Sequence, residues 1–186
     1  MRVLSVVLIS LFVGAVHAQE KNNELRIAAQ YPLKHGIIFG NPYNISPVGG
    51  ATITGVRALD KHFGLAAQIG YNELEITRNT NRGFIRTFRR SWTSAKVFAE
   101  GDFGNEASIV PRAGIGLAFA NSNGYTEYGL AAEVGLLAKL KLTNKMSIFV
   151  AGDVQVMPYM DVIILDNLDA SEEYYARARA GLSFSF

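Results

Sequence analysis

The chain has 186 residues, 49% of them hydrophobic, with 18 lysines and arginines against 16 aspartates and glutamates. The formal charge of +2 gives no reason to expect a general nucleic-acid binder, and the absence of cysteine excludes disulfide scaffolds and thiol chemistry. This length suits one domain of ordinary size and hardly two.

The first 18 residues have the pattern of a secretory signal peptide. Arg2 supplies the charged start, residues 3–16 form the apolar core, and Val16, His17 and Ala18 form a small-residue cleavage site. The alternative is an N-terminal membrane anchor, but the apolar run of about 14 residues is shorter than the roughly 20 that a spanning helix needs. We therefore expect residues 1–18 to be removed and residues 19–186 to form the mature domain.

The mature part contains no long apolar run, which excludes helical spans and leaves β-spans open. Alternation of apolar and polar residues predicts the strands. In the first part of the chain it predicts a strand over Glu24–Leu33 and a weaker one over Ala51–Ala58. The stretch Lys34–Gly50, rich in Gly, Pro, Asn and Ser, is expected to be a long loop, and Asp60–His62 a tight connection.

The next two predicted strands are less regular. One begins near Phe63, and its phase inverts after Tyr71, where Leu74 becomes an apolar position; this predicts a bulge or a strand that has left the membrane. A loop over Arg78–Gly83 follows. The next strand mixes arginines and aromatic residues until Thr93 restores the alternation, so its first half is expected to project above the bilayer.

The second half of the chain alternates more cleanly, with apolar residues on one parity and charges on the other. The clearest strands are Tyr125–Leu142 and the last one, Tyr174–Phe186. The full set of elements expected here is a turn at Gly101–Glu106, a strand over Ala107–Ala120, a hairpin at Asn121–Gly124, the strand Tyr125–Leu142, a turn at Thr143–Lys145, a strand over Ile148–Val156, an acidic loop over Asp161–Glu172 and the strand Tyr174–Phe186.

This makes eight strands, an even number. Connections after the second, fourth and sixth strands are short, whereas three of the four after odd strands are longer. That rhythm is typical of a membrane barrel with short periplasmic turns, longer outside loops and both chain ends in the periplasm. Since strands can span hydrocarbon only as a closed ring, we expect an all-β fold, an eight-stranded antiparallel up-and-down transmembrane β-barrel.

The parity predicted to face the lumen carries both signs of charge. Its members are Arg26, Arg57, Lys96, Glu100, Arg112, Glu127, Glu133, Lys139, Lys141, Asp153, Arg177 and Arg179. Arg177 and Arg179 of the last strand have candidate partners in Glu127, Glu133 and Asp153, and with Arg112 these six form the expected lumen charge cluster. Because unpaired charges in a narrow interior are costly, we expect a plugged, salt-bridged lumen. The alternative is a water-soluble barrel or sandwich with its polar face outside, which would bind a small apolar ligand.

The C-terminal residues carry a family resemblance. Arg179 to Phe186 match the outer-membrane β-signal, which has a polar residue, a glycine and two apolar or aromatic positions separated by one residue. With the eight-strand count, the chain resembles the OmpA/OmpX-type small outer-membrane barrels. The resemblance implies that the barrel-assembly machinery reads Gly181, Phe184 and Phe186. Alternatively, Phe186 sits in an aromatic girdle, a role compatible with the first.

The resemblance also raises an enzymatic alternative, because some small outer-membrane barrels modify lipid A. Similarity to the deacylases would require a His-x-Ser pair, which the chain lacks. After removal of the signal the histidines are His35, in the first predicted loop, and His62, in a turn on the opposite side. His35 with Ser46 and a loop carboxylate could form a triad only if their geometry allowed it.

Five arginines cluster between the third and fourth predicted strands: Arg78, Arg82, Arg86, Arg89 and Arg90. Guanidinium groups match phosphate geometry, so one hypothesis is that they hold lipopolysaccharide phosphates, with Phe88 and Trp92 near the interface. The alternative is solvated loop charges or ion pairs with Glu73 and Glu75.

Together these features predict a non-enzymatic protein of the bacterial outer membrane, monomeric, without cofactor or metal, that supports envelope integrity or presents surface loops. Its expected partners are outer-membrane lipid, lipopolysaccharide and, during biogenesis, the barrel-assembly machinery. The rival functions are a lipid A-modifying enzyme and a secreted barrel that binds an apolar ligand.

Overall fold

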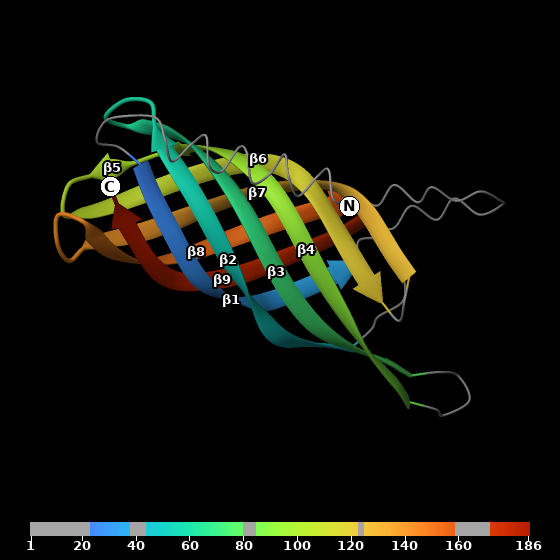
Figure 1. The fold of residues 1–186 in the computed structure, drawn as a ribbon. Coiled ribbons are helices and arrows are strands. Elements are labelled where there is room, and N and C mark those ends of the chain that lie inside the picture. The colour runs from blue at the N-terminus through green and yellow to red at the C-terminus, as the bar shows by residue number, and fades with distance from the viewer. Residues whose placement is uncertain (1–22, 38–43, 80–84, 123–124, 159–171) are drawn as a thin grey trace.

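The computed structural model describes residues 23–37, 44–79, 85–122, 125–158 and 172–186. In this part of the chain all regular structure is β-strand (Figure 1). The strands are β1 (Asn23–Ile37), β2 (Asn44–Ala58), β3 (Phe63–Asn79), β4 (Ile85–Gly101), β5 (Phe103–Gly104), β6 (Ala107–Ser122), β7 (Tyr125–Lys141), β8 (Met146–Pro158) and β9 (Glu172–Ser185). Among these residues, no helix has the length and apolarity to cross a membrane.

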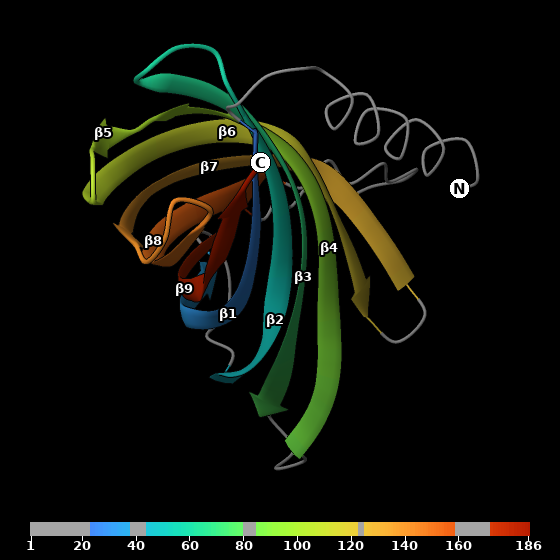
Figure 2. The same cartoon turned by 60° about the vertical axis from the view of Figure 1, so that its left-hand side comes forward.

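The long strands close into a ring. Each pairs antiparallel with its neighbour in sequence; β1 pairs with β9, and β4 pairs with β6 past the two-residue β5. Figures 1 and 2 show the strands lying obliquely side by side around one interior. The predicted eight-stranded up-and-down barrel is confirmed. The short β5, which pairs only with β6, lies within the region predicted to be a plain turn.

The two faces of the wall differ in polarity. Large apolar side chains point outward and are exposed, among them Ile27, Leu65, Val97, Ile115 and Val134, whereas alternate residues such as Arg26, Lys96 and Glu133 are buried inside. Apolar and polar residues alternate in this way because successive side chains of a β-strand point to opposite faces of the sheet. The facing is the reverse of that in the water-soluble alternative, which would bury the apolar parity and expose the charges.

The predicted loop over Lys34–Gly50 is wrong at both ends, because β1 continues to Ile37 and β2 already begins at Asn44. In the described part of this stretch, Pro47 and Gly49 lie at an irregularity of the ladder rather than at a strand end, and Pro32 does so just before the stretch. The register of β1 with β9 shifts between Pro32 and Lys34, and that of β2 with β3 shifts between Pro47 and Gly49. Gly49 has a φ of 127°, which favours glycine.

The bulge predicted after Tyr71 is absent from the β3–β4 ladder, which is continuous from the Phe63–Gly101 pair to the Asn79–Ile85 pair. Leu74 shares the inward parity of Gln68 and Asn72 and is fully buried. The inverted pattern after Tyr71 therefore marks the point where the inward-facing side chains of β3 change from polar to apolar. The β3–β4 hairpin also extends past β6, since residues 85–89 pair with β3 and the β4–β6 ladder begins at Arg90 (Figure 1).

The inward placement predicted for Arg57 is also wrong. Thr52 and Thr54 are the buried residues of β2, so Arg57 lies on the other parity and is exposed at the strand end. The turn that follows is held by Asp60, whose Oδ1 accepts hydrogen bonds from the backbone N–H groups of His62 at 2.7 Å and Phe63 at 2.8 Å. These two donors lower the pKa of the Asp60 carboxyl.

Candidate functional site

The candidate site is the interior of the barrel, where buried charged side chains from strands on all sides come together. Glu133 of β7 is at its centre. Its carboxylate accepts hydrogen bonds from Lys96 Nζ, from Arg177 Nη2 and, at 3.1 Å, from Arg112 Nη2. All four side chains have 0% exposure, so this is an ion-pair group removed from water.

Asp153 of β8 is the second centre. Arg179 binds its carboxylate with two nitrogens, Nε at 2.6 Å and Nη2 at 2.8 Å, the fork arrangement that matches guanidinium to carboxylate. The Nε atoms of Arg112 and Arg177 each lie 3.7 Å from an Asp153 oxygen. Glu133 and Asp153 therefore share Arg112 and Arg177.

A third group closes the end of the lumen near the short turns. Arg26 donates to Glu100 at 2.7 Å and to Glu24 at 2.8 Å, and Arg112 Nη1 lies 3.4 Å from Glu100. Lys139 Nζ contacts Asp102 at 2.5 Å. The network thus runs continuously from this mouth to the middle of the barrel.

Two glutamines complete the network, and they were not among the predicted site residues. Gln68 Oε1 accepts from Arg112 Nη2 at 2.7 Å and from Arg179 Nη1 at 2.9 Å, and Gln155 Oε1 accepts from Lys96 Nζ at 2.6 Å. Both lie on the polar parity of their strands, which is the signal that could have identified them. An uncharged amide is easily passed over when only ionisable residues are searched.

Apolar residues lie on either side of these charges. Towards the β3–β4 hairpin, an apolar layer is formed by Leu74, Trp92, Ala118, Ala120, Ala131 and Tyr175. The rings of Trp92 and Tyr175 have centroids 6.0 Å apart. The hypothesis that Trp92 lies at the membrane interface is therefore wrong, because its side chain is buried in the lumen. A second apolar group, nearer the short turns, contains Ala28, Val110, Leu137, Phe149 and Ala151.

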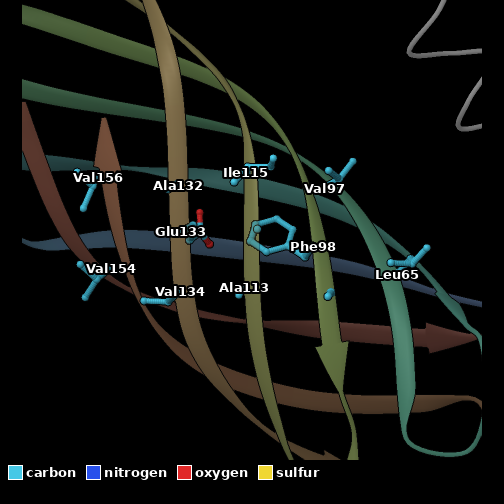
Figure 3. A pocket seen from close by; sticks show the side chains of 12 residues that line it. Leu65, Val97, Phe98, Ala113, Ile115, Ala132, Glu133, Val134, Val154 and Val156 are labelled. Carbon is cyan, nitrogen blue, oxygen red and sulfur yellow. The ribbon is translucent and has the colours of Figure 1, made fainter. Parts of the chain in front are cut away.

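Figure 3 shows how the wall separates the two environments where β4, β6, β7 and β8 meet. Val97, Ile115 and Val134 line a shallow apolar hollow on the outer surface and are 59–67% exposed. Glu133 and Phe98, one residue along their strands, are buried on the lumen side. The guanidinium carbon of Arg112 lies 3.7 Å from the centroid of the Phe98 ring, a cation–π contact inside the lumen.

The structure brings together five of the six residues predicted for the lumen charge cluster: Arg112, Glu133, Asp153, Arg177 and Arg179. The sixth, Glu127, is in β7, but its side chain lies outside the described residues. Arg26, Lys96 and Glu100, predicted only as inward-facing charges, are full members of the same network.

The arginine cluster is only partly described. Arg82 and the side chains of Arg78 and Arg86 lie outside the described residues. The Arg89 side chain is 71% exposed and lies 3.4 Å from Glu73, one of the ion pairs named as the alternative. The guanidinium carbon of Arg90 is 5.1 Å from the ring centroid of Trp92, so this side chain borders the apolar layer of the lumen.

The proposed assembly residues lie at the seam that closes the barrel. Phe184 and Phe186 are exposed, by 36% and 55%, and Phe186 exchanges backbone hydrogen bonds with Asn23 at 3.0 and 3.3 Å. Gly181 faces Ala28 across the β1–β9 ladder. A Cβ atom at Gly181 would lie 2.1 Å from the carbonyl oxygen of Ile27, so the close approach of these two strands itself requires glycine.

The geometry of the alternative triad of His35, Ser46 and a loop carboxylate is not defined, because the side chain of His35 lies outside the described residues. His62 stacks on Phe103, with ring centroids 5.8 Å apart, in the turn region. Among the described residues, no group of three or more His, Cys, Asp or Glu side chains is arranged to hold a metal ion.

Neither a protein-family model nor a curated protein matches the chain. Solved structures do match over almost the whole length. A major outer membrane protein from Thermus thermophilus aligns with a TM-score of 0.58 at 11% identity, covering 88% of this chain and 99% of that one. Neisserial surface protein A aligns at 0.54 and 11% identity, covering 90% and 100%.

OprG from Pseudomonas aeruginosa aligns with a TM-score of 0.53 at 8% identity, covering 90% of this chain and 97% of that one. At such low identity the matches speak to the fold alone. They agree with the closed ring of antiparallel strands. The chain is therefore an eight-stranded antiparallel β-barrel with the fold of the small bacterial outer-membrane proteins.

Proposed function

We propose that this protein is a non-enzymatic barrel of the bacterial outer membrane whose lumen is sealed, and that it supports the envelope or presents its loops at the cell surface. The observation that carries this proposal is the filled interior: Lys96, Arg112, Glu133 and Arg177 have no exposed side-chain surface. A pore needs a continuous wet path, and a cross-section closed by ion pairs between apolar layers leaves little room for one.

The outer-membrane location is supported by the exposed apolar parity and by the fold. A water-soluble protein rarely exposes so much contiguous apolar surface. Membrane fractionation with gel mobility before and after boiling tests it. We expect the protein in the outer-membrane fraction, with folded and unfolded bands, and recovery in the soluble periplasmic fraction would contradict the location.

The sealed lumen is tested by single-channel recording in planar bilayers. We expect no steady ohmic conductance from the full-length mature protein. The double variant Glu133→Ala/Arg177→Ala is the positive control, because it removes both partners of one buried ion pair. If the ion pairs form the seal, this variant should show a higher conductance than the unmodified protein. A large, steady conductance from the unmodified protein would overturn the proposal.

The absence of enzymatic activity is likewise part of the proposal. It is supported by the lack of a His-x-Ser pair in the chain and by the position of His62 in a turn, stacked on Phe103. Incubation of the purified protein with lipopolysaccharide, followed by mass spectrometry of lipid A, is the test. Loss or transfer of an acyl chain would favour the lipid A-modifying alternative.

The barrel-assembly machinery remains the proposed reader of Gly181, Phe184 and Phe186. The outward exposure of both phenylalanines at the C-terminal edge supports this role. Deleting Phe186 should lower the yield of heat-modifiable protein in the outer membrane without changing refolding of the purified chain in detergent. Unchanged assembly in cells would remove the recognition role and leave Phe186 as a girdle residue.

Lipopolysaccharide is the proposed partner of the arginine cluster, of which Arg89 is the member with a described and exposed side chain. Replacing Arg78, Arg82, Arg86, Arg89 and Arg90 with Gln should reduce lipopolysaccharide co-purification. A variant with Arg57 and Lys61 replaced, both exposed at the opposite end of the barrel, is the control. Equal co-purification from all three proteins would dispose of the idea.

A further inference from the structure

Among the described side chains of the lumen, the cations outnumber the carboxylates by one. Among the side chains that the structure describes, the network contains six cations and five carboxylates: Arg26, Lys96, Arg112, Lys139, Arg177 and Arg179 with Glu24, Glu100, Asp102, Glu133 and Asp153. At the mouth, Arg26 is matched by Glu24, and Lys139 is matched by Asp102. Lys96, Arg112, Arg177 and Arg179 then share Glu100, Glu133 and Asp153, so that within the described part of the lumen one positive charge has no counter-charge.

The hydrogen bonds of the layer show the same shortage of acceptors. The neutral oxygen of Gln68 serves two guanidinium groups, those of Arg112 and Arg179. Even so, four buried donors among these side chains have no hydrogen-bond partner: Gln68 Nε2, Arg112 Nε, Arg177 Nε and Arg177 Nη1. The Nε atoms at least face Asp153 at 3.7 Å, whereas Nη1 of Arg177 makes no hydrogen bond in the described part of the barrel.

Arg177 is the largest of the fully buried side chains in the described part of the barrel, with 1% of its surface exposed. Unpartnered amide oxygens do exist in the lumen, on Gln30 and Asn72, but neither accepts a hydrogen bond from these cations. A buried donor without an acceptor and a buried charge without a counter-charge are both costly. One bound anion at this point would relieve both costs together.

We propose that the lumen binds one small monovalent anion of the halide class at Nη1 of Arg177. One negative charge matches the excess, and the flanking apolar residues, with Tyr175 and Trp92 on the hairpin side, favour a compact ion over a large or doubly charged one. The anion is thereby a structural component of the plug, a role distinct from the surface functions proposed above.

Crystals of the full mature protein grown in sodium bromide provide the direct test. We expect an anomalous difference peak in contact with Nη1 of Arg177, and a weaker one in Lys96→Gln, where the excess charge has been removed. Water at this position would supply the missing acceptor, and loss of the Lys96 proton would remove the excess charge, both without an anion. In either case no bromide peak would be present, and the proposal would be overturned.

Thermal unfolding followed by gel mobility provides a second test that needs no crystals. At equal concentration and pH, we expect the midpoint to be about 5 °C or more higher in sodium chloride than in sodium gluconate, whose anion is too large to enter. Equal midpoints in the two salts would contradict the proposal.

The variant Gln68→Glu sharpens this test, because it adds a carboxylate oxygen where Gln68 already accepts from Arg112 and Arg179. It should reduce the chloride effect to about 1 °C or less. Asn144→Asp makes the same charge change in an exposed turn and should keep the full effect. If Gln68→Glu does not fold, Lys96→Gln removes the same unit of charge. Failure of the halide tests leaves the sealed lumen standing, since conductance measures that separately.

Discussion

The lumen contains two kinds of filling that meet different physical requirements. The charged layer around Glu133 and Asp153 is held by directional contacts, in which each carboxylate serves several cations. The apolar layer around Leu74 and Trp92 is held by shape and volume. Removing one group from the first leaves charges without partners, whereas removing one from the second leaves a cavity. Both layers close the barrel, but they should fail in different ways.

The largest effect is expected from Glu133→Gln, which keeps the shape of the side chain and removes the charge shared by Lys96, Arg112 and Arg177. Loss of one partner from a buried ion-pair group costs about 3–5 kcal/mol. Urea unfolding of the refolded protein, followed by boiling-dependent gel mobility, measures it. Glu106→Gln, in an exposed turn, should change stability by no more than about 0.5 kcal/mol. Equal urea midpoints for both variants would show that the charged layer does not stabilise the barrel.

Leu74→Ala tests the apolar layer. The side chain has 0% exposure, so truncation should cost about 2–4 kcal/mol through lost burial and the cavity left behind. Trp92 is the single tryptophan of the chain and belongs to the same layer, so its emission should shift to the red and acrylamide quenching should increase. Leu65→Ala, on the exposed outer face, should leave both fluorescence signals unchanged. A red-shifted, readily quenched Trp92 in the unmodified protein would contradict the burial.

A smaller loss of stability is expected when a methyl group is added next to the charged layer. A Cβ at Gly135 would lie 2.1 Å from Asp153 Oδ1, so Gly135→Ala must displace a carboxylate that Arg179 holds, at a cost of about 1–3 kcal/mol. Gly152→Ala is the matched control, because nothing lies within 4 Å of its added Cβ. The unfolding midpoint of Gly135→Ala should therefore be lower than that of Gly152→Ala. Identical midpoints would mean that the charged layer can accommodate the added methyl group without loss of stability.

The smallest effect is expected outside both layers, at the exposed Arg89–Glu73 pair. Arg89→Gln should cost less than about 1 kcal/mol, and the difference should shrink as salt rises from low to molar concentration. The same salt titration should leave the Glu133→Gln difference nearly unchanged, since buried pairs are poorly screened. A large, salt-independent effect at Arg89 would require a buried partner for this side chain.

The predictions from sequence succeeded where one regular pattern decided the outcome. The two faces of β7 and β9 follow directly from alternation in Tyr125–Leu142 and Tyr174–Phe186, because side chains of an extended strand point to opposite sides. The same rule failed at Arg57, where the short pattern in β2 fitted either facing. The prediction of a loop over Lys34–Gly50 also failed at its C-terminal end, because Pro47 and Gly49, residue types that usually end strands, are accommodated at an irregularity of the β2–β3 ladder.

Within the candidate site, the parity of each strand predicted most inward-facing charges but not the apolar layer. Leu74 was interpreted as a change of phase, and Trp92 as an interface residue, because a membrane barrel was expected to be polar inside and aromatic at its rim. The two side chains meet Tyr175 of β9, about a hundred residues along the chain from Leu74, and no local pattern reports such a contact.

The sequence by itself determined that this chain forms a wall with one apolar and one polar face, since a period of two is a local property of each strand. It also determined which charged residues lie on the polar face and can therefore point into the lumen. Only the tertiary structure decided which charges meet. Lys96 of β4, Arg112 of β6 and Arg177 of β9 converge on one carboxylate because ring closure and the stagger between strands bring opposite walls within reach. The excess of one cation among the described side chains becomes visible only after these partners have been assigned.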